Sequence, residues 1–168
     1  MIYLDTETTG LYPSIDEILE IAIINEHGQI ELNTLLKPET NLEWPEAERI
    51  HGISPEHVKD ACSVRNLPSL LEPILARHDK LVIYNALFDT NFIIALYQDQ
   101  DRPIPTLIHE ANCAMRRYSH WIGNHRWYKL SVAAFEAGHV WQGKAHRALA
   151  DCYATKTVWE YLDEQGAE

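Results

Sequence analysis

Two acidic residues near the start of the chain have a spacing that suits cation-dependent chemistry. Asp5 and Glu7 are two positions apart at the end of a short apolar run, Ile2–Thr6, that is typical of a buried strand. Side chains two apart on a strand project from the same face, so both carboxylates are expected side by side. Like charges held that close raise each other's pKa unless a cation intervenes. Alone, the pattern is weak, because solvated acids at a strand end look the same.

Two further clusters pair an acid with a polar residue. Asn85 and Asp89 follow a compact strand, where Asn85 could simply cap the next helix and Asp89 could simply favour its first turn. His146 and Asp151 are five residues apart, which on one continuous helix would place them about 140° apart. They can share a site only if His146 lies on the loop before that helix.

Taken together, four acids and one histidine indicate a metal site: Asp5, Glu7, Asp89, Asp151 and His146. Carboxylates gathered at one edge of a sheet repel one another, and Mg²⁺ or Mn²⁺, which prefer oxygen ligands, would relieve that repulsion. Two such ions about 4 Å apart form an arrangement suited to in-line displacement at phosphorus. A neutral histidine nearby could take the proton of an attacking water.

The elements that must position these residues form an α/β pattern. Strands are expected over Ile2–Thr6, Ile18–Asn25, Ile30–Lys37, Lys80–Tyr84 and Thr106–His109. Helices are expected over Pro45–Ile50, Pro55–Asp60, Leu67–Arg77, Leu87–Gln98, Leu130–Ala137 and Ala148–Gln165. The turn Glu26–Gln29 makes the second and third strands a hairpin, which is antiparallel. A strand meander followed by alternating strands and helices predicts one mixed sheet flanked by helices.

Length and composition are those of a globular protein with one domain. The 168 residues, 46% of them hydrophobic and 23% charged, are enough for one core and too few for two large ones. No apolar run approaches the ~20 residues of a membrane span, and no secretory signal is visible. The three widely spaced cysteines suit a reducing compartment. We therefore expect one cytoplasmic domain over residues 1–168, without contact to a membrane.

The charge is distributed unevenly along the chain. A formal net charge of −11 at first argues against nucleic acid as a partner, because proteins that bind phosphates are usually basic. Residues 111–150 nevertheless hold six basic residues and one acid, a net +5, interleaved with tyrosine and tryptophan. Such a segment could follow a phosphate backbone, although on its own an ordinary solvated surface explains it better. The six are Arg116, Arg117, Arg126, Lys129, Lys144 and Arg147.

The residues that could carry chemistry also resemble a known family. Asp5-Thr-Glu-Thr-Thr-Gly10, Asn85-x-x-Phe88-Asp89 and His146-x₄-Asp151 match, in order, the three exonuclease motifs of the DEDDh (DnaQ-like) 3′–5′ exonucleases. The segments Ile50–Ile53 and Tyr128–Leu130 also look like family landmarks. The resemblance covers about residues 1–162 and includes likeness to exonuclease X and to the epsilon proofreading subunit of bacterial DNA polymerase III.

This resemblance implies a ribonuclease H-like fold, a five-stranded mixed sheet with strand 2 antiparallel and flanked by helices. By position, Asp5 would bridge two divalent ions, Mg²⁺ or Mn²⁺. Glu7 and Asp151 would hold one of them and Asp89 would support the other, while His146 would be the general base. The residues expected to line or shape the site of the terminal nucleotide are Thr6, Thr8, Leu11, His51, Gly52, Asn85 and Phe88.

The activity implied by the resemblance is hydrolysis of 3′-terminal phosphodiester bonds, with single-stranded DNA favoured as substrate and nucleoside 5′-monophosphates as products. An exonuclease that trims RNA 3′ ends would share the same motifs. A non-catalytic nucleic-acid-binding module would be expected to lack one of the five residues, and all five are present. A polymerase or a second copy of the chain could be a partner. Tyr84 departs from the family, which usually has histidine there, and we expect altered substrate contacts or packing rather than lost chemistry.

Overall fold

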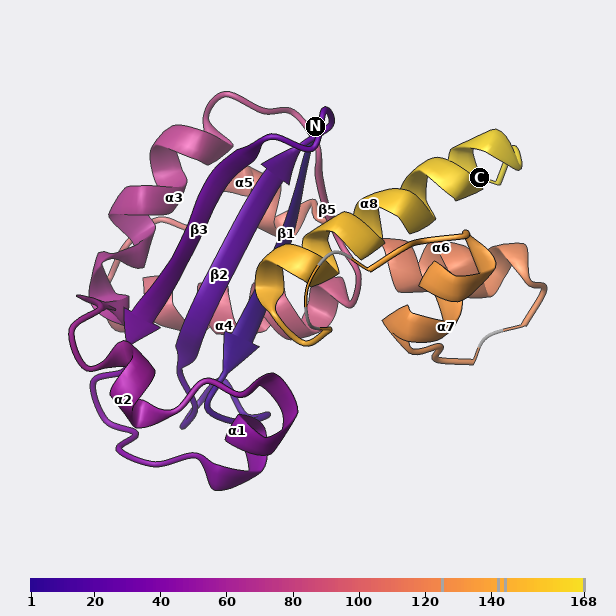
Figure 1. Cartoon of the computed structure of the whole chain (residues 1–168). Coiled ribbons are helices and arrows are strands. Elements are labelled where there is room, and N and C mark those ends of the chain that lie inside the picture. The colour runs from indigo at the N-terminus through magenta and orange to yellow at the C-terminus, as the bar shows by residue number, and fades with distance from the viewer. Residues whose placement is uncertain (125, 142, 144, 168) are drawn as a thin grey trace.

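The computed structural model describes residues 1–124, 126–141, 143 and 145–167, so that Lys144 of the basic segment lies outside it (Figure 1). The strands are β1 (Ile2–Thr8), β2 (Ile18–Asn25), β3 (Ile30–Lys37), β4 (Cys62–Ser63), β5 (Leu81–Ile83) and β6 (Asn112–Cys113). The helices are α1 (Pro45–His51), α2 (Pro55–Val58), the 3₁₀ turn η1 (Val64–Asn66), α3 (Leu67–Leu75), α4 (Ala86–Asp99), α5 (Thr106–His109), α6 (Ala114–Trp121), α7 (Leu130–Glu136) and α8 (Ala148–Glu164). In these ranges no helix has the length and apolar character needed to cross a membrane.

One mixed sheet, in the order β4-β3-β2-β1-β5-β6, forms the centre of the fold. β2 is antiparallel to both β1 and β3, whereas β5 is parallel to β1 and β6 is parallel to β5. The α/β class and the antiparallel second strand are therefore confirmed. The expected count of five strands is wrong, because the sheet has six. The two edge strands, β4 and β6, have two residues each, which is too short to leave an alternating pattern in the sequence.

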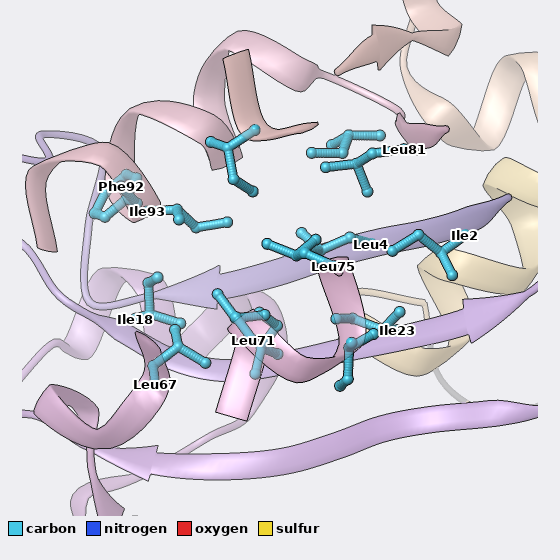
Figure 2. Close-up of a cluster of buried hydrophobic side chains, with 14 of the residues drawn as sticks. Ile2, Leu4, Ile18, Ile23, Leu67, Leu71, Leu75, Leu81, Phe92 and Ile93 are labelled. Carbon is cyan, nitrogen blue, oxygen red and sulfur yellow. The ribbon is translucent and has the colours of Figure 1, made fainter. Parts of the chain in front are cut away.

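Helices cover both faces of the sheet, and successive residues of β1 point to opposite sides. Ile2 and Leu4 join the core under α3 and α4, where leucines of α3 pack against β1 and β2 (Figure 2). Tyr3 joins the second core, under α6, α7 and α8. Because side chains alternate along a strand, Asp5 and Glu7 belong to the side of α8 and Thr6 to the side of α4.

The segment Thr106–His109 is a helix, α5, and the prediction of a strand there is wrong. A short apolar run cannot be distinguished from a buried turn of helix by its pattern alone. Pro105 directly precedes α5 and has no N–H to donate to a strand ladder, which favours the start of a helix there. The strand expected in this region lies a few residues later, as β6.

Three neighbouring parallel strands, β1, β5 and β6, end at the same edge of the sheet. In Figure 1 this is the lower edge, where α8 begins before it crosses the sheet and where α1 and α2 lie beyond the strands. The first turns of α4 and α6 follow the ends of β5 and β6 directly. Residues far apart in the sequence therefore meet at this edge.

Candidate active site

Three acids converge where β1 ends and α8 begins. Asp5 and Glu7 lie on the face of β1 that α8 covers, and Asp151 lies in the first turn of α8. Each of the three half-buried side chains offers one carboxylate oxygen, and these oxygens lie within 4.8 Å of one another. The expected meeting of the first and third motifs is what the structure shows.

Asp89, the fourth predicted acid, reaches the same edge from α4 on the other side of the sheet. Its Oδ1 accepts hydrogen bonds from the backbone N–H of Thr6, at 3.0 Å, and from the Thr6 hydroxyl, at 2.7 Å. The group of three close oxygens does not include Asp89. Its charge still acts on that group, since it is one of the causes that raise the pKa of Asp5.

Burial and mutual repulsion hold these carboxyl groups partly protonated. Burial, followed by the charges of Asp89, Asp151 and Glu7, raises the pKa of Asp5 well above its ordinary value. Burial and the charge of Asp151 raise the pKa of Glu7 to about 8. For Asp89 burial raises the pKa to about 7, and for Asp151 to about 6. A divalent cation would relieve this repulsion, and an all-carboxylate donor set fits Mg²⁺ or Mn²⁺.

His146 lies on the loop before α8, outside the helix, as its spacing from Asp151 requires. Its backbone N–H donates a hydrogen bond to Asp151 Oδ1 at 3.2 Å. Its φ is 62°, in the left-handed region that few residues other than glycine adopt. The side chain is exposed to solvent next to the acid cluster. A histidine there can exchange protons with a molecule bound at the cluster.

An ion pair between a buried acid and a partly exposed arginine, which the sequence did not reveal, ties this loop to the sheet. Glu20 of β2 stands opposite Glu7 in the register and is 3% exposed. Its carboxylate accepts from Arg147 Nη2 at 2.6 Å and Nε at 3.0 Å, and from the Ala148 N–H at 3.0 Å. Arg147 directly follows His146. The available signal was one acid within an otherwise uncharged strand, Ile18–Asn25.

A cleft of about 700 Å³ opens beside the acids, between the end of β1, the following loop and α1. Leu11 is 70% exposed at its rim. Of the seven residues predicted to contact a terminal nucleotide, five line this cleft: Thr6, Thr8, Leu11, His51 and Phe88. Gly52 and Asn85 are not among its lining residues, although they neighbour residues that are.

The walls of this cleft are fixed by hydrogen bonds. His51 Nδ1 accepts from the Ile53 N–H at 2.9 Å, so its Nε2 carries the proton and donates to the Thr8 carbonyl at 3.2 Å. Gly52 ends α1 with a φ of 77°, which suits glycine. At Gly10, a Cβ would lie only 2.4 Å from the Asp16 carboxylate, so this turn requires glycine. His51 thus positions the cleft wall with both ring nitrogens.

Tyr84 and Asn85 connect β5 to α4. Asn85 is the residue that precedes α4, and its side chain makes no capping hydrogen bond, so the alternative that Asn85 serves only as a helix cap is not supported. Tyr84 is 6% exposed. Its hydroxyl donates to the Tyr128 carbonyl at 2.8 Å. Tyr84 therefore acts in packing and in fixing the segment at residue 128.

Comparison with known proteins gives consistent matches. Residues 2–159 match the family RNase_T, described as exonuclease. The chain is 38% identical to the uncharacterized exonuclease CP81 of Escherichia phage 186, over 99% of this chain and 89% of that protein. It is 36% identical to DNA polymerase III subunit epsilon of Rickettsia conorii, over 55% of this chain and 41% of that protein.

Solved structures share the fold. The nuclease domain of 3′hExo, a DEDDh family member bound to rAMP, superposes with a TM-score of 0.79 at 19% identity, over 99% of this chain and 92% of that one. Exonuclease X in complex with 5′ overhanging duplex DNA superposes with a TM-score of 0.71 at 22% identity, over 99% of this chain and 93% of that one. The mixed sheet and its flanking helices are thus arranged as in these nucleases.

Proposed function

Because the chain belongs to the RNase_T exonuclease family, we propose that it removes nucleotides one at a time from the 3′ end of single-stranded DNA and releases nucleoside 5′-monophosphates. Family membership makes it an exonuclease, a phosphodiester hydrolase. The observation that carries the finer proposal is the convergence of three carboxylates within 4.8 Å at the strand ends, next to an exposed histidine.

The acids would hold two divalent ions. Asp5 would contact both, with Glu7 and Asp151 completing the site of one and Asp89 supporting the other. When bound, these ions would lower the pKa of the attacking water and neutralise charge on the phosphate. Thr6 fixes the Asp89 carboxylate through two hydrogen bonds to Oδ1, which orients that side chain before substrate arrives.

His146 would be the general base. Its imidazole takes a proton from the attacking water as the new oxygen–phosphorus bond forms and the bond from phosphorus to the 3′ oxygen breaks. The freed 3′ oxygen ends as the hydroxyl of the shortened strand, and the terminal nucleotide leaves with a 5′ phosphate. The hydrogen bond from the His146 backbone to Asp151 keeps the base beside the acids.

The cleft lined by Thr6, Thr8, Leu11, His51 and Phe88 would receive the terminal nucleotide. Leu11 at the rim and the half-buried Phe88 ring offer apolar faces for a base. Gly52 and Asn85 would shape the cleft from behind, through the end of α1 and the start of α4.

DNA is favoured over RNA by the relatives, because the epsilon subunit that the chain resembles is named as part of a DNA polymerase. A polymerase is for the same reason the protein partner that we propose. Trimming of RNA 3′ ends is the alternative, and digestion of DNA and RNA strands of one sequence would distinguish the two.

Digestion of end-labelled strands tests this function. We expect a 5′-labelled single strand to give a ladder of products shortened from the 3′ end, with Mg²⁺ or Mn²⁺ but not with EDTA. Single-stranded DNA, duplex DNA and RNA of one sequence should be compared, and single-stranded DNA should be degraded fastest. Internal fragments without a ladder would contradict the exonuclease polarity, and faster digestion of RNA would contradict the DNA preference.

A further inference from the structure

A second cleft, of about 690 Å³, lies along α6 and the loop after it. We call it the basic cleft, after the side chains that line it: Asn112, Arg116, Arg117, His120, Arg126 and Trp127. No acidic side chain is among its described lining residues, although the chain has 25 acids and 14 lysines and arginines. The basic cleft thus carries charge of the opposite sign to the chain as a whole, and it suits a polyanion.

Two of its arginines are available to a ligand. Arg117 is engaged, because its guanidinium donates to Asp163 at 2.6 Å and lies 4.3 Å from the Trp159 ring. Arg116 and Arg126 are exposed and form no ion pair with any residue in the described ranges. Arg116 of α6 and Arg126 of the following loop thus offer two free guanidinium groups to the phosphates of one bound strand.

Trp127 presents its ring to solvent on a fixed backbone. It is 72% exposed, although tryptophan is on average highly buried. The residue before it is held at both its N–H and its carbonyl: the Arg126 N–H donates to Asn124 Oδ1 at 3.0 Å, and the Arg126 carbonyl accepts from the Ser119 hydroxyl. An exposed aromatic ring beside free arginines is the pairing that stacks on bases of a single strand.

The basic cleft begins at β6, whose end lies on the same edge of the sheet as the acids. The Tyr84 carbonyl accepts from the Met115 N–H at 2.9 Å and from Cys113 Sγ at 3.2 Å, and both of these residues line the basic cleft. Tyr84 lies two residues before the helix that bears Asp89. β1 and β6 are separated only by β5, so the two strands run about 10 Å apart where they lie side by side, and β1 continues beyond the level at which β6 ends. A strand with its 3′ end at the acids can reach the basic cleft within a few nucleotides.

We propose that the basic cleft binds the single strand of the substrate upstream of its 3′ end, with Arg116 and Arg126 on phosphates and Trp127 stacked on a base. A single strand is the occupant rather than a duplex, because an unpaired base can leave its neighbours to stack on a side chain. Tyr84 is a positioning residue for this cleft, since its hydroxyl holds the Tyr128 carbonyl next to Trp127. The proposal rests on the proposed function for its placement of the 3′ end.

Equilibrium binding without turnover tests the proposal. In EDTA, the affinity for a 5′-labelled single strand of about 12 nucleotides is measured across a salt series by fluorescence anisotropy. Each phosphate contact to a single strand contributes about 0.7 to the slope of log affinity against log salt. R116A/R126A removes two such contacts and should therefore make the slope shallower by about 1.4. The control R77A/R102A removes two arginines that pair with acids on the α3 side of the sheet and should leave the slope unchanged.

Two further variants test the aromatic contact. The strand should quench tryptophan fluorescence of the unaltered protein, and W127A should remove most of that quenching and weaken binding about tenfold, since one stacked base is worth ~1–3 kcal/mol. Y84F keeps the ring and should weaken binding less than W127A does. Equal slopes for R116A/R126A and its control, or unchanged quenching in W127A, would overturn the proposal, as would tighter binding of duplex than of single strand.

Cleavage separates this proposal from the proposed function. R116A/R126A should raise KM for the long strand about tenfold or more and leave a dinucleotide unaffected, because a dinucleotide is too short to extend from the acids into the basic cleft. A chain that binds the strand as described but releases no nucleotides would overturn the proposed function alone. If the unaltered chain and R116A/R126A digest both substrates equally well, the proposal that the basic cleft binds the strand is overturned, and the proposed function is unaffected.

Discussion

The carboxylates of the candidate site make the stability of the metal-free protein depend on pH. Their folded pKa values, about 6 for Asp151, about 7 for Asp89 and about 8 for Glu7, lie above the ordinary values near 4. At a pH between the unfolded and the folded pKa of each carboxyl group, the folded state keeps a proton that the unfolded chain has released. The folded state therefore loses stability as pH rises through this range. We expect Tm in EDTA to fall between about pH 6 and about pH 8, by ~3 °C for each kcal/mol lost.

Mg²⁺ or Mn²⁺ should reverse this fall. Cation binding to the ionised acids stabilises the folded state above about pH 7 and has little effect near pH 5, where the acids are protonated. Thermal unfolding with and without the cation measures both effects. D5N, which removes one of the repelling charges, should flatten the pH dependence in EDTA. A Tm in EDTA that rises from pH 6 to pH 8 would contradict the assigned direction of these pKa shifts.

His146 is predicted to act in proton transfer and not in metal binding. H146N should lower kcat about a hundredfold or more while the affinity for Mn²⁺ stays within about twofold. Asparagine is the suitable substitute, because it tolerates the left-handed backbone found at residue 146. Single-turnover cleavage and a Mn²⁺ titration give the two readouts.

H27N is a matched control. It changes an exposed histidine in the turn between β2 and β3, at the end of the sheet opposite to the acids. It should leave both values unchanged. Cleavage by H146N at the parent rate would exclude His146 as the base, and loss of Mn²⁺ binding would indicate a ligand.

At the level of elements, the start of α8 depends on the pair of Glu20 and Arg147. R147A leaves the Glu20 carboxylate buried without its charged partner, which should cost about 2 kcal/mol of folding free energy, a value between those for exposed and buried pairs. It should also lower kcat, because the loop that carries His146 loses its anchor to β2. Denaturant unfolding and kcat measure the two effects.

The double variant E20Q/R147M distinguishes positioning from stability. Glutamine at 20 removes the buried charge and keeps an oxygen for the Ala148 N–H, so most of the lost stability should return. The kcat should stay low, because the guanidinium bridge beside His146 is still absent. If kcat returned with stability, the pair would have a structural role only.

The elements also show what sequence can and cannot predict here. The strands Ile18–Asn25 and Ile30–Lys37 and the helix α8 were predictable from long apolar patterns and a clear turn. The edge strands and α5 were not, because segments of two to four residues carry no periodicity. The motif residues were predictable because their types and order match a family.

Contacts between residues far apart in the chain could not be predicted from the sequence. Glu20 meets Arg147 across 127 positions, and the Tyr84 hydroxyl meets the Tyr128 carbonyl across 44. Neither pair shares a local pattern, and the register of β1 with β2 is what sets Glu20 beside the site. The role of the basic segment likewise needed the fold, which gathers Arg116, Arg126 and Trp127 around one cleft.

For the whole molecule, the charge distribution predicts distributive digestion. A net charge of −11 disfavours a nucleic-acid backbone, so we expect binding mainly at the acids, where cations would offset their charge, and at the proposed basic cleft. Few phosphate contacts outside the site give weak binding, which added salt weakens further. In the presence of an unlabelled competitor strand, each binding event should therefore release few nucleotides, and fewer as salt increases. Long uninterrupted digestion by the isolated chain would contradict this prediction.

The release of nucleotides by the unaltered chain and by D5N tests the central claim most directly. With Mg²⁺ and a 3′-labelled single-stranded DNA, the unaltered chain should release labelled nucleoside 5′-monophosphate. D5N should be slower by about a thousandfold, because losing a shared metal ligand removes several kcal/mol of transition-state stabilisation. Release by D5N at the parent rate, or no release by the unaltered chain, would contradict the assignment of Asp5 and its neighbours as the catalytic centre.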